Sequence, residues 1–272
     1  MGKVFSLMQN KGGVLKTTSA VSLASILSQK GRDGYGCRIL IIDMDNQGNA
    51  AVSFNVNPDK CDNTIYDVLV GGVHPEEAII NVHENIDLLP ANDDMQFFEI
   101  DLLRDNSKVD QIMFLLKKAI EKIRHNYDAI FIDSPPNMGI NIANIINASD
   151  YVLIPFNPES FSMRSLMKLF DTLQDFKQKT NPNLEILGVF GTLVRMSTVV
   201  HSEILQETRK YTLENNIHMF DTVIPHSIRF ATAVAYEGKP AVLTDANNKL
   251  VHSYYELYEE MIEALSQRKE LV

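Results

Sequence analysis

The feature that most constrains the fold of this chain is a regular alternation of apolar runs with segments of helical periodicity. The apolar runs predict strands over 3–8, 37–43, 86–91, 127–133, 151–156, 184–194 and 218–224. The periodic segments predict helices over 17–30, 107–125, 160–179, 200–215 and 248–267. Several strands are unbroken Ile, Leu and Val, which is typical of strands buried on both faces of a parallel sheet. We therefore expect an α/β fold with a doubly wound, mostly parallel sheet flanked by helices.

Length and composition limit the number of domains and the size of the core that this alternation can form. The chain has 272 residues, of which 45% are hydrophobic, and this is enough to bury a substantial core. No repeat, low-complexity segment or linker interrupts the pattern, so the simplest prediction is one domain over 1–272. The stretch 56–104 has weaker periodicity, and we expect short helices and loops there.

Charge and metal-binding residues disfavour several classes of protein. The net charge of −10 argues against nucleic-acid binding over the whole surface but is compatible with a local basic patch. Cys37 and Cys61 offer no disulfide framework, which favours a reduced, cytoplasmic protein. The histidines are scattered, so no zinc site is predicted. The apolar run 4–8 is too short for a signal peptide, and no stretch approaches the length of a membrane span.

The first predicted strand leads into QNKGGVLKTT, residues 9–18, which is rich in glycine and lysine. The general phosphate-binding pattern is GxxxxGK(S/T). Lys16 and Thr17 match its last pair, whereas Asn10 and Leu15 stand where its two glycines would be. The loop therefore departs from the general pattern at both glycines while keeping its lysine and hydroxyl.

The chemistry of a phosphate site is nonetheless present in this loop. Gly12 and Gly13 allow backbone N–H groups to turn towards phosphate oxygens, and a helix beginning near Thr17 adds its positive N-terminal end. Lys16 can reach the β- and γ-phosphates of a nucleotide, and the Thr17 hydroxyl can ligate Mg²⁺. The alternative is a glycine-rich turn from strand to helix that binds nothing.

Three aspartates stand at the ends of predicted strands. Asp43 and Asp45 follow one strand in IIDMDNQGN, and Asp133 ends another in IFIDSPPN. Ligands of open parallel sheets bind beyond the carboxyl ends of the strands, so these side chains should gather around the glycine-rich loop. Each aspartate alone is also compatible with a helix cap or a turn. Together with the loop, they predict a magnesium and nucleotide site.

These segments together resemble the ParA family of deviant-Walker ATPases, which includes Soj and MinD. The family loop KGGxxK(S/T) is matched from Lys11 to Thr17. The family usually has glycine at the position of Leu15, but plasmid partition members vary there, so Leu15 favours a plasmid-type relative. Further similar segments are IIDMDNQGNA, IFIDSPPNMG, SDYVLIPFNPESFSMRSL and TVIPHSIRFATAVAYEGKPAVLTD.

The resemblance implies a role for each matching residue. Lys11 would reach across an ATP-bound sandwich dimer to the partner's phosphates and neutralise charge in the transition state, as an arginine finger does. Asp45 would position the attacking water. Mg²⁺ would be held by Thr17 and Asp133, with Asp43 supporting them. The nucleotide contacts would be Lys11, Gly12, Gly13, Val14, Leu15, Lys16, Thr17, Thr18 and, against adenine, the loop around Pro225.

The same resemblance helps to decide whether the protein binds DNA or a membrane. ParA-like dimers bind DNA non-specifically through basic residues, for which Arg229 matches the family motif and Arg195 lies near a second motif position. MinD-type relatives carry a basic amphipathic C-terminal helix that lies on membranes, whereas this tail is rich in glutamate and would be repelled by anionic lipid. The glycine-rich loop begins almost at once, as in relatives without an N-terminal helix-turn-helix domain.

The sequence thus predicts an Mg²⁺-dependent ATPase that partitions DNA. ATP would drive formation of a homodimer, the dimer would coat DNA, and a ParB-like centromere-binding partner would stimulate hydrolysis and release. We expect such a protein to be cytoplasmic and associated with the nucleoid. Two alternatives stay open: a positioning ATPase for a cargo other than DNA, and a nucleotide-gated binding module in which Leu15 has sacrificed hydrolysis.

Overall fold

The computed structural model describes residues 2–31, 36–104, 111–137, 139–159, 162–195 and 198–268. In this part of the chain, eight strands form one sheet in the order β3-β4-β2-β5-β1-β6-β7-β8. The strands are β1 (Lys3–Leu7), β2 (Ile39–Asp43), β3 (Ile80–His83), β4 (Ile86–Leu89), β5 (Ala129–Asp133), β6 (Tyr151–Phe156), β7 (Glu185–Val194) and β8 (Met219–Pro225). Neighbouring strands are parallel except β3 and β4, which are antiparallel. The predicted doubly wound, mostly parallel sheet is confirmed.

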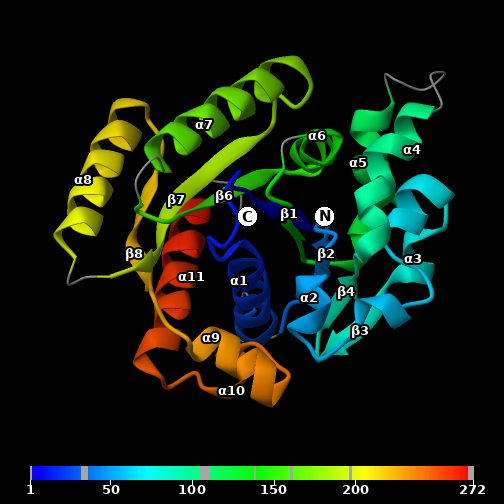
Figure 1. The fold of residues 1–272 in the computed structure, drawn as a ribbon, viewed down its shortest axis with the longest axis horizontal. Helices are drawn as coiled ribbons and strands as arrows, with labels where there is room; N and C mark the ends of the chain where they lie inside the picture. Colours follow the sequence, from blue (N-terminus) through cyan, green and yellow to red (C-terminus); the bar gives the residue numbers. More distant parts are fainter. Residues whose placement is uncertain are drawn as a thin grey trace.

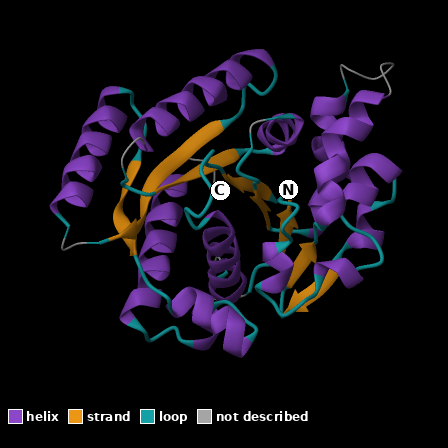
Figure 2. Ribbon diagram, viewed as in Figure 1, coloured by secondary structure: helices purple, strands orange, loops and turns teal. Residues whose placement is uncertain are grey.

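Helices cover both faces of the sheet (Figure 1; Figure 2 shows the two layers by secondary structure). They are α1 (Lys16–Lys30), α2 (Asn49–Val52), α3 (Pro75–Ala78), α4 (Phe98–Arg104), α5 (Leu115–Ile123), α6 (Ile140–Ala148), α7 (Ser162–Lys179), α8 (Val199–Glu214), α9 (Arg229–Thr232), α10 (Ala241–Thr244) and α11 (Lys249–Gln267). Because side chains alternate along a strand, Phe5 and Leu7 of β1 pack with α1 and α11, whereas Val4 packs with α5, α6 and α7.

The regions that the sequence did not predict have short or mixed patterns. All seven predicted strands are present, but β3 was missed, because its four residues are only partly buried and carry no apolar run. Helix α6 was also missed, since its sequence INIANIINA alternates Ile with Asn and Ala rather than showing an amphipathic stripe. Of the helix predicted over 107–125, residues 107–110 lie outside the described part, and the α-helix itself begins at Leu115.

One edge of the sheet is closed by a side chain. Glu260 of α11 accepts the backbone N–H groups of Asp221 at 2.7 Å and of Thr222 at 2.9 Å, both in the edge strand β8. The Thr222 hydroxyl also donates to Glu260. Backbone donors that an edge strand usually leaves open are therefore already occupied here.

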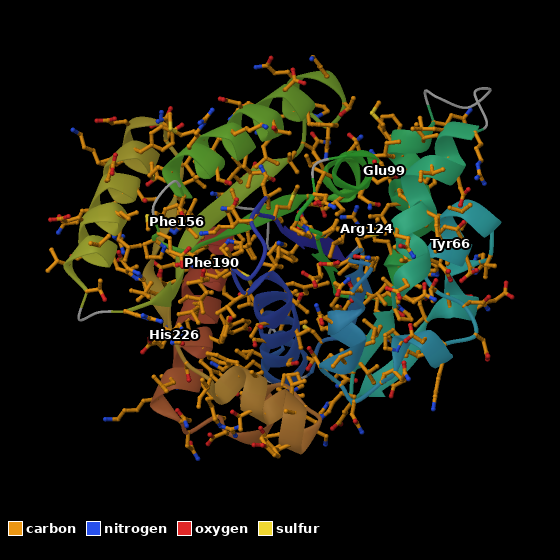
Figure 3. All side chains as sticks on the ribbon, viewed as in Figure 1. Tyr66, Glu99, Arg124, Phe156, Phe190 and His226 are labelled. Carbon is orange, nitrogen blue, oxygen red and sulfur yellow. The ribbon has the colours of Figure 1, made fainter. Side chains whose placement is uncertain are left out.

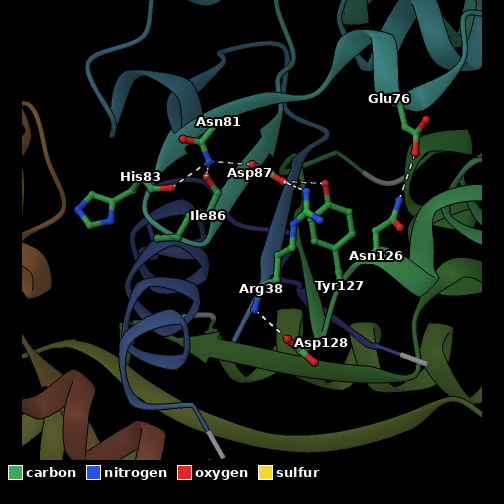
Figure 4. Close-up of polar contacts among 9 residues, drawn as sticks. All are labelled: Arg38, Glu76, Asn81, His83, Ile86, Asp87, Asn126, Tyr127 and Asp128. Atoms are coloured by element: carbon green, nitrogen blue, oxygen red, sulfur yellow. Dashed lines mark hydrogen bonds and ion pairs between the residues drawn. The ribbon is translucent and has the colours of Figure 1, made fainter. Parts of the chain in front are cut away.

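A second polar cluster lies at the amino ends of the strands (Figure 4). The carboxylate of Asp87 in β4 is almost fully buried and accepts hydrogen bonds from Arg38 at 3.2 Å, from the Tyr127 hydroxyl at 3.0 Å and from Asn81 at 2.9 Å. Burial and the neighbouring Asp87 raise the pKa of Tyr127, so its hydroxyl stays a donor. Both oxygens of this carboxylate have partners.

Candidate functional site

The loop between β1 and α1 takes two left-handed backbone conformations before the helix begins. Gly13 has φ 70°, and Leu15, the residue that caps α1, has φ 65° and ψ 32°. A left-handed conformation costs a residue other than glycine about 1–2 kcal/mol. The half-buried Leu15 side chain packs against the core cluster around α1, which offsets part of this cost. The glycine that the family pattern expects at this position thus corresponds to a real requirement for positive φ.

The first two helical residues of α1 place a cation and a hydroxyl at the carboxyl edge of the sheet. Lys16 is only 7% exposed, and its Nζ donates to the carbonyl oxygen of Lys11 at 3.1 Å. Burial lowers the pKa of Lys16, while the nearby carboxylates of Asp133 and Asp45 oppose that shift. The Thr17 hydroxyl donates to Oδ2 of Asp133. Lys16, Thr17 and Asp133 therefore meet, as the sequence predicted.

Asp43 and Asp133 are register partners on adjacent strands and both are fully buried. The two oxygens of Asp43 accept the backbone N–H groups of Asp45 at 2.9 Å and Ala50 at 3.0 Å. Oδ1 of Asp133 has no hydrogen-bond partner among the described residues. Burial raises the pKa of Asp133 to about 7, and burial together with Asp133 raises that of Asp43.

The three aspartates that were predicted to lie at the site differ in their contacts. Asp43 uses both oxygens to fix the loop from Asp45 to Ala50, so its contribution is to the shape of that loop. Asp45 itself is half-exposed, lines the cavity described below and accepts the backbone N–H of Gln47 at 3.2 Å. Among the three aspartates, Asp133 alone combines full burial with a side-chain oxygen that has no described hydrogen-bond partner, and such an oxygen is available to a metal ion.

A cavity of about 1030 Å³ opens over this cluster. Its lining combines the glycine-rich loop and the first turns of α1 with two further segments of the chain, which we call its walls. One wall is largely polar and includes Asn49, Ser53, Asn55, Asn57 and Asp59; the other is largely apolar and includes Ser227, Phe230, Ala231, Val234 and Ala235. The walls touch: the side chain of Asn55, itself at φ 60°, lies against Gly238, where a Cβ would come within 2.9 Å of it.

The remaining predicted nucleotide residues are placed differently from one another. Thr18 lines the cavity, while Val14 is buried in the protein. Pro225, predicted to contact adenine, ends β8 and is not among the described residues that line the cavity; Ser227, two residues on, is. The apolar wall around Phe230 was missed by the sequence reasoning, although its segment TVIPHSIRFATAVAYEG was part of the resemblance.

Lys11 is held by an acidic side chain that was not singled out from the sequence. Its Nζ forms an ion pair with Glu159, which follows β6, and both side chains are partly exposed. The hydrogen bond from Lys11 lowers the pKa of Glu159. Lys11 is not among the described residues that line the cavity, and the contact described for its ammonium group is the one with Glu159. The signal for Glu159 was its place in the segment SDYVLIPFNPES.

The two arginines predicted to contact DNA differ in availability. The guanidinium of Arg229 forms ion pairs with Glu237 and Asp245, both at 2.7 Å, and its side chain is 20% exposed. These two hydrogen bonds raise the pKa of Arg229. Arg195, directly after β7, is exposed, and its backbone N–H donates to His201. A phosphate group would have to displace two carboxylates to reach the Arg229 guanidinium. No ion pair with a carboxylate is described for Arg195.

The described helices include none that is both long and apolar enough to cross a membrane.

Known proteins resemble this chain over almost its whole length. A family model described as an AAA domain matches residues 2–186. The sporulation initiation inhibitor protein Soj of Bacillus subtilis is 32% identical over 262 residues, which cover 96% of this chain and 98% of Soj. The chromosome partitioning protein ParA of Myxococcus xanthus is 30% identical over 264 residues, covering 96% and 88% of the two chains. The chain belongs to the ParA family.

Solved structures support the same assignment of the ParA fold. Cobyrinic acid a,c-diamide synthase from Mycobacterium smegmatis, in a structure with a bound ATP analogue and magnesium, superimposes with a TM-score of 0.81 at 27% identity. The match covers 96% of this chain and 94% of that one. Leu15 therefore stands in the glycine-rich loop of a ParA-family protein, and the resemblance drawn from the sequence is confirmed.

Proposed function

We propose that this protein is an Mg²⁺-dependent ATPase of the ParA type that uses one domain over 1–272 to partition DNA. The main support for the proposal is Asp133, which is fully buried and has one oxygen without a described hydrogen-bond partner. This oxygen lies beside Thr17 and Lys16, next to the cavity. A buried carboxylate with an unused lone pair costs free energy unless a ligand completes it. A hydrated divalent cation bound to a nucleotide phosphate is such a ligand.

The residues present fit ATP and Mg²⁺. Thr17 and Asp133 would hold the metal ion, which when bound supplies positive charge against the phosphates. Lys16 would bind the β- and γ-phosphates, and the backbone from Gly12 to Thr18 would surround them at the N-terminus of α1. The apolar wall around Phe230, with the loop that follows Pro225, would take the base. The ATP analogue and magnesium in the Mycobacterium smegmatis neighbour support this assignment.

Hydrolysis and dimerisation would depend on the residues around that core. Asp45 would orient the attacking water from the cavity wall, and Asp43 would keep Asp45 in place through the backbone N–H that it accepts. Lys11 would leave Glu159 and neutralise charge on the phosphates of the second chain in an ATP-bound homodimer. A role in trans is supported by the partly exposed position of Lys11, which is paired with Glu159 and is not among the described residues that line the cavity.

The ATP-bound dimer would coat DNA and release it when a ParB-like partner stimulates hydrolysis. A protein that works in this way would be found at the nucleoid in the cytoplasm. The name of the Myxococcus relative, a chromosome partitioning protein, supports this function. Among the two predicted arginines we favour Arg195, since Arg229 is already paired with Glu237 and Asp245.

The test of the nucleotide site uses Lys16→Ala and Asp45→Ala. Lys16→Ala removes charge-assisted hydrogen bonds worth about 1.5–3 kcal/mol each, so calorimetry with ATP and Mg²⁺ should show loss of tight binding. Asp45→Ala should bind ATP, lose turnover and accumulate as a dimer in size-exclusion chromatography. ATP affinity within twofold of wild type for Lys16→Ala, or unchanged turnover for Asp45→Ala, would show that the roles are wrong.

The DNA half of the proposal is tested with Arg195→Glu across a salt series with ATP present. Losing one phosphate contact per chain should flatten the log–log salt dependence by up to about 1.8 units per dimer. Arg229→Glu is unsuitable, because it would place a third carboxylate beside Glu237 and Asp245. If the wild type binds no DNA at low salt with ATP, a cargo other than DNA becomes the favoured reading.

A further inference from the structure

The two walls of the cavity come into contact at one side chain, that of Asn55. A Cβ built on Gly238, which follows the apolar wall in the chain, would lie 2.9 Å from Cβ and 3.2 Å from Cγ of Asn55. Asn55 lines the cavity and is exposed, and its side-chain amide has no hydrogen-bond partner among the described residues. The amide is therefore available to a bound molecule at the place where the two walls meet.

The other asparagines of the polar wall differ from Asn55 in their bonding or their position. Oδ1 of Asn57 accepts the backbone N–H of Asp59 at 3.0 Å, so this amide already fixes a turn. Asn49 directly precedes Ala50, whose backbone N–H donates to Asp43, so it lies beside the residues proposed for magnesium and phosphate. Asn55 is thus the amide of this wall that is next to the apolar wall and has both polar atoms unused.

Charge makes one part of the cavity suitable for phosphates and another part suitable for a neutral group. Among the described residues that line the cavity, Lys16 is the only cation, and it follows the glycine-rich loop. The polar wall instead carries the carboxylate of Asp59. A triphosphate is attracted to Lys16 and repelled by a carboxylate. The neutral base of a nucleotide is therefore the part that fits beside Asn55.

The apolar wall offers a surface for the ring of such a base. The segment that forms it begins directly after His226, which is labelled in Figure 3. Val234 and Ala235 line the cavity and belong to a π-helix over Ala233–Glu237, a rare conformation that occurs frequently at functional sites. A purine is a flat ring with a polar edge. Its ring can lie against this wall with the polar edge directed towards Asn55.

The side-chain amide of asparagine matches the edge of one purine better than that of the other. Its carbonyl oxygen accepts a hydrogen bond, while its NH₂ group donates one. Adenine presents the complementary pair, an amino group that donates beside a ring nitrogen that accepts. Guanine has a carbonyl oxygen in place of this amino group, so the amide oxygen would face a second acceptor. An amide at this position therefore favours adenine.

We propose that Asn55 is the residue by which this protein selects adenine nucleotides, with its amide accepting from the exocyclic amino group and donating to the adjacent ring nitrogen. The inference rests on the proposed function, because it requires the nucleotide to bind in this cavity. It adds a specificity-determining side chain from the wall opposite the one to which the base was assigned.

The test compares ATP with GTP and with purine riboside triphosphate, which lacks the amino group of adenine, by calorimetry with Mg²⁺. The wild type should bind ATP roughly tenfold or more tightly than either of the others, as expected for a bidentate contact to a base. Asn55 has φ 60°, and Asn55→Gly removes the amide while glycine keeps this conformation at no steric cost. In this variant, ATP and purine riboside triphosphate should bind within about threefold of each other, because the amino group has lost its acceptor.

Two further variants separate the amide from the backbone. Asn85 also has positive φ, 59°, but it directly precedes β4 and is not among the described residues that line the cavity. Asn85→Gly makes the same chemical change there and should leave the preference for ATP as in the wild type. Asn55→Asp keeps an acceptor for the amino group, so it should still prefer ATP to purine riboside triphosphate.

The role of Asn55 would be overturned by equal affinity of the wild type for ATP and purine riboside triphosphate. An unchanged preference for ATP in Asn55→Gly would overturn it as well, and so would loss of the preference in Asn85→Gly. All three results would leave the nucleotide site itself in place. If the wild type binds none of the three nucleotides, the proposed ATP site is wrong and the role of Asn55 is wrong with it.

Discussion

Both ends of the sheet bury a carboxylate, but they treat it in opposite ways. At the amino ends, Asp87 accepts hydrogen bonds from Arg38, Tyr127 and Asn81 (Figure 4). At the carboxyl ends, Asp133 is more deeply buried, accepts one hydrogen bond from Thr17, and leaves its other oxygen without a described partner. The first arrangement satisfies its polar groups within the protein. The second leaves one oxygen without a described partner, and the proposed metal ion would complete it.

The same contrast extends to the backbone. A left-handed residue at the amino edge is Asn85, directly before β4, and asparagine adopts this conformation readily, whereas the loop at the carboxyl edge holds a leucine, Leu15, in it. Local strain and an unpartnered buried group at one edge are typical of a binding site that the remaining structure supports. The cluster around Asp87 at the amino edge then contributes to stability. Variants in this cluster should mainly lower the free energy of unfolding, whereas variants around Asp133 should mainly lower ATP turnover.

The largest expected effect is that of Asp133→Asn on function. Replacing the carboxylate by a neutral amide should lower ATP turnover by roughly 100-fold or more, the effect of losing a charged group that stabilises the transition state. Stability in urea without nucleotide should change by less than about 1 kcal/mol, because losing the attraction to Lys16 is offset by relief of a buried, unpartnered charge. A loss of stability without a loss of turnover would reverse the roles of the two edges.

Asp87→Ala should have the opposite profile. It leaves the Tyr127 hydroxyl and the Arg38 guanidinium without their acceptor, and the free energy of unfolding should fall by about 2 kcal/mol. Turnover per folded molecule should stay within twofold of wild type, because the cavity lies at the other edge. Asp87→Asn, which keeps one acceptor oxygen, is the matched control and should lose less stability. Impaired ATP hydrolysis in correctly folded Asp87→Ala would contradict the separation.

Glu159→Gln probes the ion pair at the carboxyl edge that is open to solvent. An exposed pair contributes at most about 1 kcal/mol, so stability should barely change. Releasing Lys11 from the carboxylate should favour the ATP-bound dimer by up to about fivefold in its dissociation constant. Analytical ultracentrifugation with ATP and Mg²⁺ measures this, with Lys11→Ala as the variant that should prevent the gain. Weaker dimerisation in Glu159→Gln would mean that Glu159 helps Lys11 to act.

Leu15→Gly should have the smallest effect. The backbone is already left-handed, so glycine removes about 1–2 kcal/mol of strain while giving up the packing of a half-buried leucine. We expect ATP affinity and turnover within about threefold of wild type, which corresponds to a net change below about 0.7 kcal/mol. A rise of turnover by orders of magnitude would instead support the alternative that Leu15 suppresses hydrolysis.

The sequence predicted the features of the two sheet edges that depend on local sequence pattern, namely the strands and the aspartates at their ends. Continuous apolar runs located the strands, and their ends placed Asp43, Asp45 and Asp133 near the glycine-rich loop, because the carboxyl ends of parallel strands lie at the same edge of the sheet. It did not distinguish their environments. That Asp43 is satisfied by the backbone of Asp45 and Ala50 depends on how the chain turns after β2, and no residue type in that segment encodes it.

Long-range contacts were equally beyond the sequence. Glu159 was visible as part of a family-like segment, but its pairing with Lys11 joins residues 148 positions apart. The ion pairs of Arg229 with Glu237 and Asp245 were not visible in the sequence, and its predicted contact with DNA stays a prediction. In both cases the residue type was read correctly, while its partner was decided by tertiary packing.

The hydrogen bonds that Glu260 makes to Asp221 and Thr222 in β8 limit how copies of this protein can assemble. A filament built by adding strand to strand would first have to expel this carboxylate from the sheet margin. At the opposite margin, β3 is only four residues long and its register is interrupted between Asn81 and His83. Among the described strands, neither border of the sheet offers a continuous template, and this disfavours a polymer that grows by strand addition relative to one that grows through helices and loops.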